Sequence, residues 1–491
     1  MNKTRIFSKI IAGVSERGLD LLLITIWCAV IITIVSFPEA VNLLLLLILA
    51  LIVTSIVFKK SWVLIPLYLI LGTSIFDITK LPSINIGGIN DIYLIDILSI
   101  LLLIVLFINY KKLLTYHHNK TIFYFLLFIT IRFIFTSIQL FIGIGTIRDF
   151  AIEFIRNQVP SLVFFIFLIN RNPVTKNIMG FGQIIGIITV SFFIAVSISG
   201  NVLFNSDIFL IKSNLAVMSF AGLRRIVSPG LLLSIPIYFF SYSFFLYSNA
   251  VKNKLWNLIG ILLGLFGLII YGFRSIWITV IFLTVIMTFI QIMRMYKSEH
   301  KTYRIVSYII SLLLLTVIVF ILYENTTGYI SEIINRTITI FDSIDNNDPS
   351  FINRINDIKW AWKVIKTHPI TGMAIGKPFS EVSINLGSQW IGISHNGYVS
   401  LALNYGLLTV IPFLLLIINL GKDIIRQFYS ANNPYREAIF LGLIGLFFEF
   451  ILINFVNSLV TSMEGNMLFS ILIGLSLEPI IKGNGYEKKA R

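Results

Sequence analysis

Few side chains in this sequence can act as an acid or base near neutral pH, and one of them occupies an unusual position. The chain has five histidines, and His395 directly precedes a long apolar run in QWIGISHNGYVSLALNYGLL, residues 389–408. A neutral imidazole at the end of an apolar helix could accept a proton from a reacting hydroxyl. It could equally cap that helix at an interface. Asn396 follows it and adds a polar side chain at the same point.

Arginines at two other places could bind an anion. Arg274 lies in YGFRSIW, in a short turn between two apolar runs, and Arg224 and Arg225 lie in GLRRIVSPG, just before another. A planar guanidinium group matches phosphate oxygens better than an ammonium group does, so two separate arginine sites could hold a pyrophosphate. Each arginine taken alone could instead be an interfacial anchor or the partner of a carboxylate.

A few charged residues fall inside the apolar runs, where a charge is costly and needs a partner or a function. They are Asp96, Arg132, Glu449 and Glu478. Asp96 and Arg132 lie on successive runs, and we expect them to pair. The sequence DNND at 345–348 is the nearest approach to a carboxylate metal motif, but a solvated turn explains it better. We therefore predict no metal.

The elements that must position these residues are membrane-spanning helices. Hydrophobic residues make up 57% of the 491 positions and charged residues 12%, which is outside the range of soluble globular proteins. Most of the apolar runs are long enough to cross a hydrocarbon layer of about 30 Å as a helix. The sequence predicts an all-α polytopic membrane protein with about 12–14 transmembrane helices. The runs fall at 20–37, 41–58, 62–76, 91–109, 122–142, 159–170, 178–200, 230–249, 255–271, 275–294, 304–323, 396–420, 437–459 and 465–482.

The net charge of +15 reflects membrane topology. Most of the 38 Lys and Arg fall in alternate loops, in pairs such as Lys59–Lys60 and Lys111–Lys112, and cytoplasmic loops are the ones enriched in these residues. This pattern places both termini in the cytoplasm and argues against nucleic-acid binding. Cys28 is the only cysteine, which excludes a disulfide framework and a cysteine-based metal site.

The chain divides into three parts on this topology. Residues 1–323 hold eleven transmembrane helices, 324–395 form a large extracytoplasmic loop, and 396–491 hold three more helices and a short basic cytoplasmic tail. An amphipathic helix is expected near 350–366, with Pro369 as its stop. It would lie on the membrane surface or pack on the loop's own core. Its predicted apolar stripe consists of Phe351, Ile355, Ile358, Trp362 and Ile365.

These motifs together resemble the O-antigen ligase and Wzy-type O-antigen polymerase family over roughly 270–410. In that family an arginine precedes an aromatic-rich span, a large loop carries an arginine, a tryptophan and a Pro–Gly–Gly segment, and a His–Asn pair opens the next span. The matching residues are Arg274, Trp277, Arg354, Trp360, Pro369, Gly372, Gly376, His395, Asn396, Leu401 and Gly406.

The resemblance implies a glycosyltransferase of the GT-C type in the bacterial cytoplasmic (inner) membrane, with undecaprenyl-pyrophosphate-linked glycan as donor and no metal, nucleotide or other cofactor. His395 would act on the acceptor hydroxyl and Arg274 on the pyrophosphate. Arg224, Arg225, Arg354, Trp360 and Asn396 would bind substrate. A chain-length regulator is a possible partner.

Within this family we favour a polymerase that joins lipid-linked repeat units into O-antigen, capsular or exopolysaccharide at the outer face of the membrane. Two alternatives stay open. A ligase would transfer the finished glycan to lipid A–core, and no residue identifies the acceptor. A flippase or other polysaccharide transporter would carry its ionisable residues near the membrane midplane, whereas this chain concentrates its unusual Arg, His and Trp at one face.

Overall fold

The computed structural model of the protein describes residues 60–72, 84–86, 89–116, 118–143, 146–170, 175–199, 218–220, 223–225, 229–247, 251–271, 274–296, 349–373 and 396–487. Most of these residues are helical, and within this part of the chain the strands are confined to two short hairpins. The predicted all-α membrane fold is confirmed.

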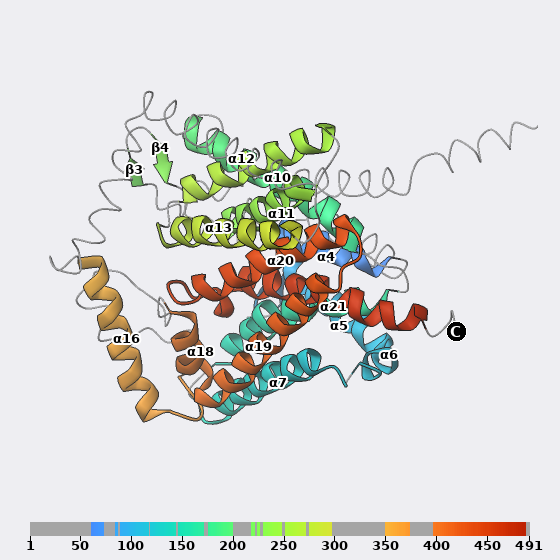
Figure 1. Ribbon diagram of the computed structural model, residues 1–491. Helices are drawn as coiled ribbons and strands as arrows, with labels where there is room; N and C mark the ends of the chain where they lie inside the picture. The colour runs from blue at the N-terminus through green and yellow to red at the C-terminus, as the bar shows by residue number, and fades with distance from the viewer. Residues whose placement is uncertain are drawn as a thin grey trace, which may run out of the picture.

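The helices form a bundle of long, mostly apolar elements (Figure 1). In chain order they are α4 (Leu64–Gly72), α5 (Leu94–Ile108), α6 (Tyr110–Leu114), α7 (Lys120–Phe141), α8 (Ile147–Ala151), α9 (Phe165–Ile169), α10 (Thr175–Ser199), α11 (Ser234–Tyr247), α12 (Val251–Tyr271), α13 (Arg274–Tyr296), α16 (Pro349–Thr367), α18 (Gly397–Tyr405), α19 (Leu407–Tyr429), α20 (Pro434–Ile453) and α21 (Met463–Glu487).

Shorter elements connect the long helices. A π-helical segment (Ile152–Gln158) and a 3₁₀ segment (Val159–Phe164) lead from α8 into α9, and single 3₁₀ turns occur at Ser61–Val63, Pro229–Leu233 and Leu459–Thr461. The antiparallel hairpins pair β1 (Ile84–Ile86) with β2 (Ile89–Ile92) and β3 (Met218–Phe220) with β4 (Leu223–Arg225).

Seven helical stretches in the described residues are long and apolar enough to cross a membrane. They are Lys120–Phe141, Ile152–Ile169, Asn177–Ile194, Gly230–Tyr247, Asn253–Tyr271, Ile276–Arg294 and Leu407–Tyr429. Two shorter apolar helices, Ser61–Ile70 and Ile95–Ile108, accompany them. The predicted spans at 20–37, 41–58 and 304–323 lie outside the described residues.

Contacts between α13 and α20 define two ends of the bundle. The two helices run antiparallel: Thr279 donates to Glu449 at one end, and Arg294 forms an ion pair with Glu437 at 3.0 Å at the other. We call the end at which α13 begins the site end, and the opposite end the basic end.

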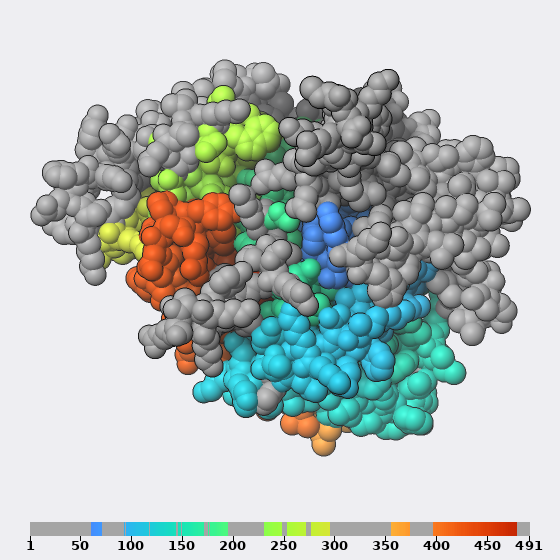
Figure 2. All heavy atoms as spheres, turned by 90° about the vertical axis from the view of Figure 1, so that its right-hand side faces the viewer, coloured from blue at the N-terminus to red at the C-terminus, as the bar shows by residue number. Residues whose placement is uncertain are grey.

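Basic residues gather at the basic end, where α6, α7, α13, α19 and α20 begin or finish. They include Lys111, Lys112, Lys120, Arg294, Lys422, Arg426 and Arg436. Hydrogen bonds tie this end together, because Thr121 donates to Asp423 at 2.7 Å and Arg294 donates to the Phe428 carbonyl at 2.7 Å. Viewed from this side, residues drawn in light blue to teal form the lower part of the surface (Figure 2).

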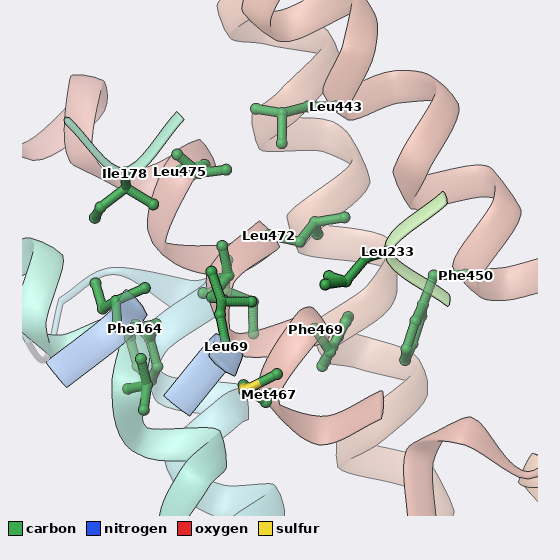
Figure 3. Close-up of a cluster of buried hydrophobic side chains, with 14 of the residues drawn as sticks. Leu69, Phe164, Ile178, Leu233, Leu443, Phe450, Met467, Phe469, Leu472 and Leu475 are labelled. Atoms are coloured by element: carbon green, nitrogen blue, oxygen red, sulfur yellow. The ribbon is translucent and has the colours of Figure 1, made fainter. Parts of the chain in front are cut away.

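The core of the bundle is packed with large apolar side chains from helices far apart in sequence. Leu69 of α4, Phe164, Leu233, Phe450 of α20 and Phe469 of α21 converge in it (Figure 3). Close helix contact depends on small residues, as expected in membrane bundles. A Cβ on Gly445 would lie 2.6 Å from a ring carbon of Phe239, so the glycine lets α20 pack tightly against α11.

The predicted span at 396–420 is wrong as a single helix, because the chain turns sharply at Gly406. This residue has φ +83° and ψ 163°, a conformation that essentially only glycine adopts. The short helix α18 precedes the turn and α19 follows it. Figure 1 shows α18 lying across the ends of the long helices instead of continuing the line of α19, with α16 beyond it.

Residues 369–373, which we call the docking segment, pack directly on this turn. The Leu407 amide donates to the Pro369 carbonyl at 2.8 Å, and the Met373 amide donates to the Leu403 carbonyl at 2.6 Å. Gln139 of α7 donates to the carbonyls of Thr371 and Asn404. The turn exposes backbone groups that α18 and α19 cannot satisfy themselves, and these bonds provide their partners.

We expect Gly406→Ala to destabilise the protein more than Gly143→Ala. Both glycines have positive φ, so each substitution carries a conformational cost of about 1–3 kcal/mol. A Cβ at 406 would also lie 1.8 Å from the Ile370 carbonyl oxygen, whereas a Cβ at 143 meets no atom within 4 Å. Thermal unfolding of the detergent-solubilised protein would measure the difference. Equal losses for the two variants would contradict the close contact at Gly406.

Candidate active site

The first turns of α13 are fixed against two neighbouring helices. The Thr279 hydroxyl donates to Glu449 Oε1 of α20 at 2.7 Å, and the Trp277 indole donates to the Leu268 carbonyl of α12 at 2.7 Å. Glu449 is fully buried, and its second oxygen, Oε2, has no hydrogen-bond partner among the described residues. Arg274 is the first residue of α13, about 7.5 Å along the helix axis from Thr279.

The start of α18 is fixed against the end of α20. The Asn396 side chain caps α18 by accepting hydrogen bonds from the amides of Tyr398 and Val399, and it donates to the Phe455 carbonyl at 3.2 Å. The Gly397 amide donates to the Asn454 carbonyl at 2.7 Å. A Cβ at Gly397 would lie 2.4 Å from Asn454 Oδ1, so this contact requires glycine.

Tyr398 adds a second link between α18 and α20. Its hydroxyl donates to the Ile451 carbonyl at 3.2 Å. Burial raises the pKa of the Tyr398 phenol to about 12, so the hydroxyl keeps its proton and stays a donor at neutral pH.

The last turns of α20 therefore hold the starts of two helices that are more than a hundred residues apart in sequence. Glu449, which holds α13, and Asn454, which holds α18, are separated by about 7.5 Å along α20. Since Arg274 lies a similar distance beyond Thr279, α13 and α18 begin at about the same level. His395 immediately precedes Asn396 in sequence, but it lies outside the described residues.

The other arginine pair belongs to β4, which contacts α10 and α12. Arg224 pairs in register with Ser219, and Arg225 with Met218. Figure 1 shows this hairpin on the same side of the molecule as α16 and α18. The structure thus places β4 toward the site end, beside α10 and α12.

Arg354 and Trp360 lie on α16. Trp360 is half-buried and packs against a small cluster in which Ala361 and Ile365 of α16 meet Ala402 and Leu403 of α18. The predicted single apolar stripe is corrected here: Ile365 is buried against α18, but Ile358 and Trp362 remain 40% and 49% exposed. Helix α16 packs on α18 through Ile365 of the stripe and through Ala361, Trp360 and Val364, which the stripe did not include.

A buried ion pair holds the other end of α18. Arg132 of α7 donates to Glu153 at 2.8 Å and to the Tyr405 hydroxyl at 2.7 Å, and Tyr405 donates in turn to Glu153. The Arg132 guanidinium also lies 4.6 Å from the centre of the Tyr405 ring. Tyr405 is the last residue of α18, so this cluster fixes that helix directly below the Gly406 turn.

The expected pair of Asp96 with Arg132 is wrong. Arg156 takes Asp96 instead, with its Nε and Nη2 donating to the two carboxylate oxygens at 2.8 and 2.7 Å. Sequence reasoning missed both Glu153 and Arg156, because they lie just before the predicted span at 159–170. The π-helical turn carries them into the bundle, and π-helical turns often occur at functional positions.

We expect Arg132→Met and Glu153→Leu, made singly, each to destabilise the protein by about 3–5 kcal/mol, because each leaves one buried charge unpaired. The double variant should lose much less than the sum, since both charges are then removed. Thermal unfolding in detergent measures all three variants. Additive losses would show that the two charges do not interact.

Comparison with known proteins finds a family match for one part of the chain. Residues 259–414 match the family model described as O-antigen ligase, which confirms the resemblance predicted from the sequence. The matched residues include most of α12, all of α13, α16 and α18, and the beginning of α19. No curated protein matches the chain.

Proposed function

We propose that this protein is a membrane glycosyltransferase that moves a glycan from an undecaprenyl-pyrophosphate carrier to an acceptor hydroxyl. The observation that carries the proposal is that α13 and α18 begin at about the same level along α20 and are both bonded to its last turns. Arg274 opens one helix and Asn396 caps the other, and both lie within the residues that match the O-antigen ligase family. The proposed reaction needs a phosphate-binding group, for which we propose Arg274, close to a proton acceptor, for which we propose His395, the residue before Asn396 in the sequence.

The distribution of charge supports an extracytoplasmic position for the reaction. The described basic residues at the ends of α6, α7, α13, α19 and α20 gather at the end opposite to Arg274. Cytoplasmic loops are rich in Lys and Arg, so the basic end faces the cytoplasm and the site end faces outward. A lipid-linked pyrophosphate donor stores its own driving energy, and we propose that the reaction needs neither a nucleotide nor a metal.

In the proposed reaction the oxygen of an acceptor hydroxyl attacks the anomeric carbon of the donor sugar. The bond from that carbon to the pyrophosphate oxygen breaks, the hydroxyl proton passes to His395, and the carrier leaves as undecaprenyl pyrophosphate. Arg274, with Arg224 or Arg225, stabilises the negative charge on the leaving group. A single in-line displacement inverts the configuration at the anomeric carbon.

Three further residues are proposed to bind the substrate. Arg354 and Trp360 lie on α16, which packs over α18, so they can hold the glycan or its phosphate above the start of that helix. Asn396 uses its amide to cap α18 and to bond Phe455. We infer that Asn396 acts chiefly by fixing the helix that His395 precedes.

We propose that the acceptor is a second lipid-linked repeat unit, which makes the protein a polymerase of O-antigen, capsular or exopolysaccharide chains in the bacterial inner membrane. A ligase would use the same donor chemistry and lipid A–core as acceptor. A chain-length regulator is the partner expected of a polymerase.

We expect His395→Ala and Arg274→Ala to insert normally but to transfer glycan poorly. A positioned base contributes about 10²–10⁴-fold to rate, and one oriented donor to a developing charge about 10²–10³-fold. The assay is elongation of purified lipid-linked oligosaccharide by the reconstituted protein without added nucleotide. Matched controls are His368→Ala and Arg148→Ala, which remove exposed residues of the same types and should keep full activity. Full activity in either test variant would remove that residue from the mechanism.

The acceptor is tested by deleting the gene in its own bacterium and analysing the surface glycan. Loss of a polymerase should leave a single repeat unit on the surface, because export and attachment continue. Loss of a ligase would instead leave finished chains on the lipid carrier. If repeat units accumulate on the cytoplasmic face of the membrane, the protein is a flippase and the proposed transfer reaction is wrong.

A further inference from the structure

Helix α16 has a second apolar face that is exposed in the part of the chain that the structure describes. Its first face, centred on Ala361 and Ile365, is buried against α18. Ile358 and Trp362 lie beside it, about 40° and 80° round the axis from the centre of that face, and are 40% and 49% exposed. A tryptophan and an isoleucine side by side on an exposed helix face are expected where one side of the helix meets an apolar phase.

Lysines border this second face. Lys359, Lys363 and Lys366 are all exposed and lie about half a turn from the buried alanine, next to Trp362. Long lysine side chains beside an apolar face can keep their stems against that face and place their ammonium groups at the level of lipid headgroups. The arrangement is typical of a helix lying in a membrane interface with anionic lipids.

An exposed apolar surface on a helix long enough to cross a membrane continues from α16. Along α19 the exposed residues follow helical spacing and form one stripe, made up of Leu407, Leu408, Ile411, Leu414 and Ile418. The stripe begins at the Gly406 turn, where Leu407 is bonded to Pro369 of the docking segment. Ile370, which is 58% exposed, extends the apolar surface from the stripe toward the end of α16.

The end of α7 adds to the same belt. Phe141 and Ile142 are 88% and 61% exposed, and Gln139, two residues earlier, is bonded to the docking segment. Thus α7 ends and α19 begins beside the docking segment, and both expose large apolar side chains there. Figure 1 shows α16 outermost, next to α18 and across the ends of the long helices.

We propose that α16 is an interfacial helix whose Ile358–Trp362 face rests on the leaflet at the site end and whose lysines bind anionic phospholipid headgroups there. The adjoining face of the helix, at Ala361 and Ile365, packs on α18, so the membrane surface and the bundle together set the position of α16. This inference rests on the exposed surface of α16 and does not depend on the reaction proposed above.

The test uses the full-length protein, in which Cys28→Ser removes the only cysteine. A spin label is placed at Trp362→Cys or, as a control, at Asn356→Cys, an exposed position about a third of a turn away on the same helix. The proteins are reconstituted in vesicles of phosphatidylcholine and phosphatidylglycerol without donor lipid. Collision rates with oxygen, which enters the bilayer, and with a water-soluble nickel complex are then measured.

We expect the label at 362 to collide several-fold more with oxygen and several-fold less with nickel than the label at 356. Equal exposure to nickel at the two positions would show that the face meets water, as a glycan-binding surface does, and would overturn the proposal. Protection of position 362 from both reagents would show a protein contact, such as a second copy of the chain, and would also overturn it.

The charge requirement is tested in the same system. Vesicles of phosphatidylcholine alone, or the combined variant Lys359→Gln, Lys363→Gln and Lys366→Gln, should raise the nickel collision rate at position 362 toward that at 356. An unchanged rate in both experiments would overturn the assignment to anionic headgroups. Gel filtration of each labelled protein before reconstitution controls for loss of folding.

Discussion

Backbone groups cannot stay unsatisfied in an apolar environment, and the turn at Gly406 is where this constraint shapes the protein most. A continuous helix from residue 396 onward would satisfy itself, but it would carry the start of the helix away from α20. The turn places α18 across the bundle, and the carbonyls of Leu403 and Asn404 then need partners from elsewhere. The docking segment and Gln139 supply them. The positions of α16, α18 and the site all follow from this arrangement.

Helix α18 is held at both ends by different kinds of interaction. At Tyr405 a fully buried arginine and glutamate fix it to α7 and to the π-helical turn. At Asn396 backbone bonds and a side-chain cap fix it to the tip of α20. A short helix of nine residues would have little stability alone. Because both of its ends are fixed, α18 has a defined direction. The proposed base, His395, directly precedes this helix in the sequence.

The charged residues inside the bundle form structural ion pairs and are distinct from the residues proposed for catalysis. The ion pairs of Arg132 with Glu153 and of Arg156 with Asp96 lie within the protein and use up the charges that looked available for chemistry. Charged groups near the middle of a spanning bundle often mark a transport path. Here their close mutual contacts explain their presence, and Arg274, which is proposed to bind the leaving group, lies instead at the start of α13.

The sequence alone determined the class of fold and the approximate positions of most described spans, because long apolar runs and alternating basic loops reflect the bilayer directly. Its motif residues also predicted the resemblance of residues 259–414 to the O-antigen ligase family. It did not determine which charged residues pair. The pairing of Arg132 depends on a π-helical turn that shifts Glu153 into the bundle, and hydropathy does not register such a turn.

Only the tertiary structure decided that the run from 396 to 420 contains a sharp turn, since one glycine in an apolar sequence is compatible with a straight helix until another segment docks on it. It likewise decided which face of α16 is buried. Periodicity finds an apolar stripe, but the contact with α18 buries Ala361 and Ile365 and leaves Trp362 exposed, because the direction from which α18 approaches is set by the turn at Gly406.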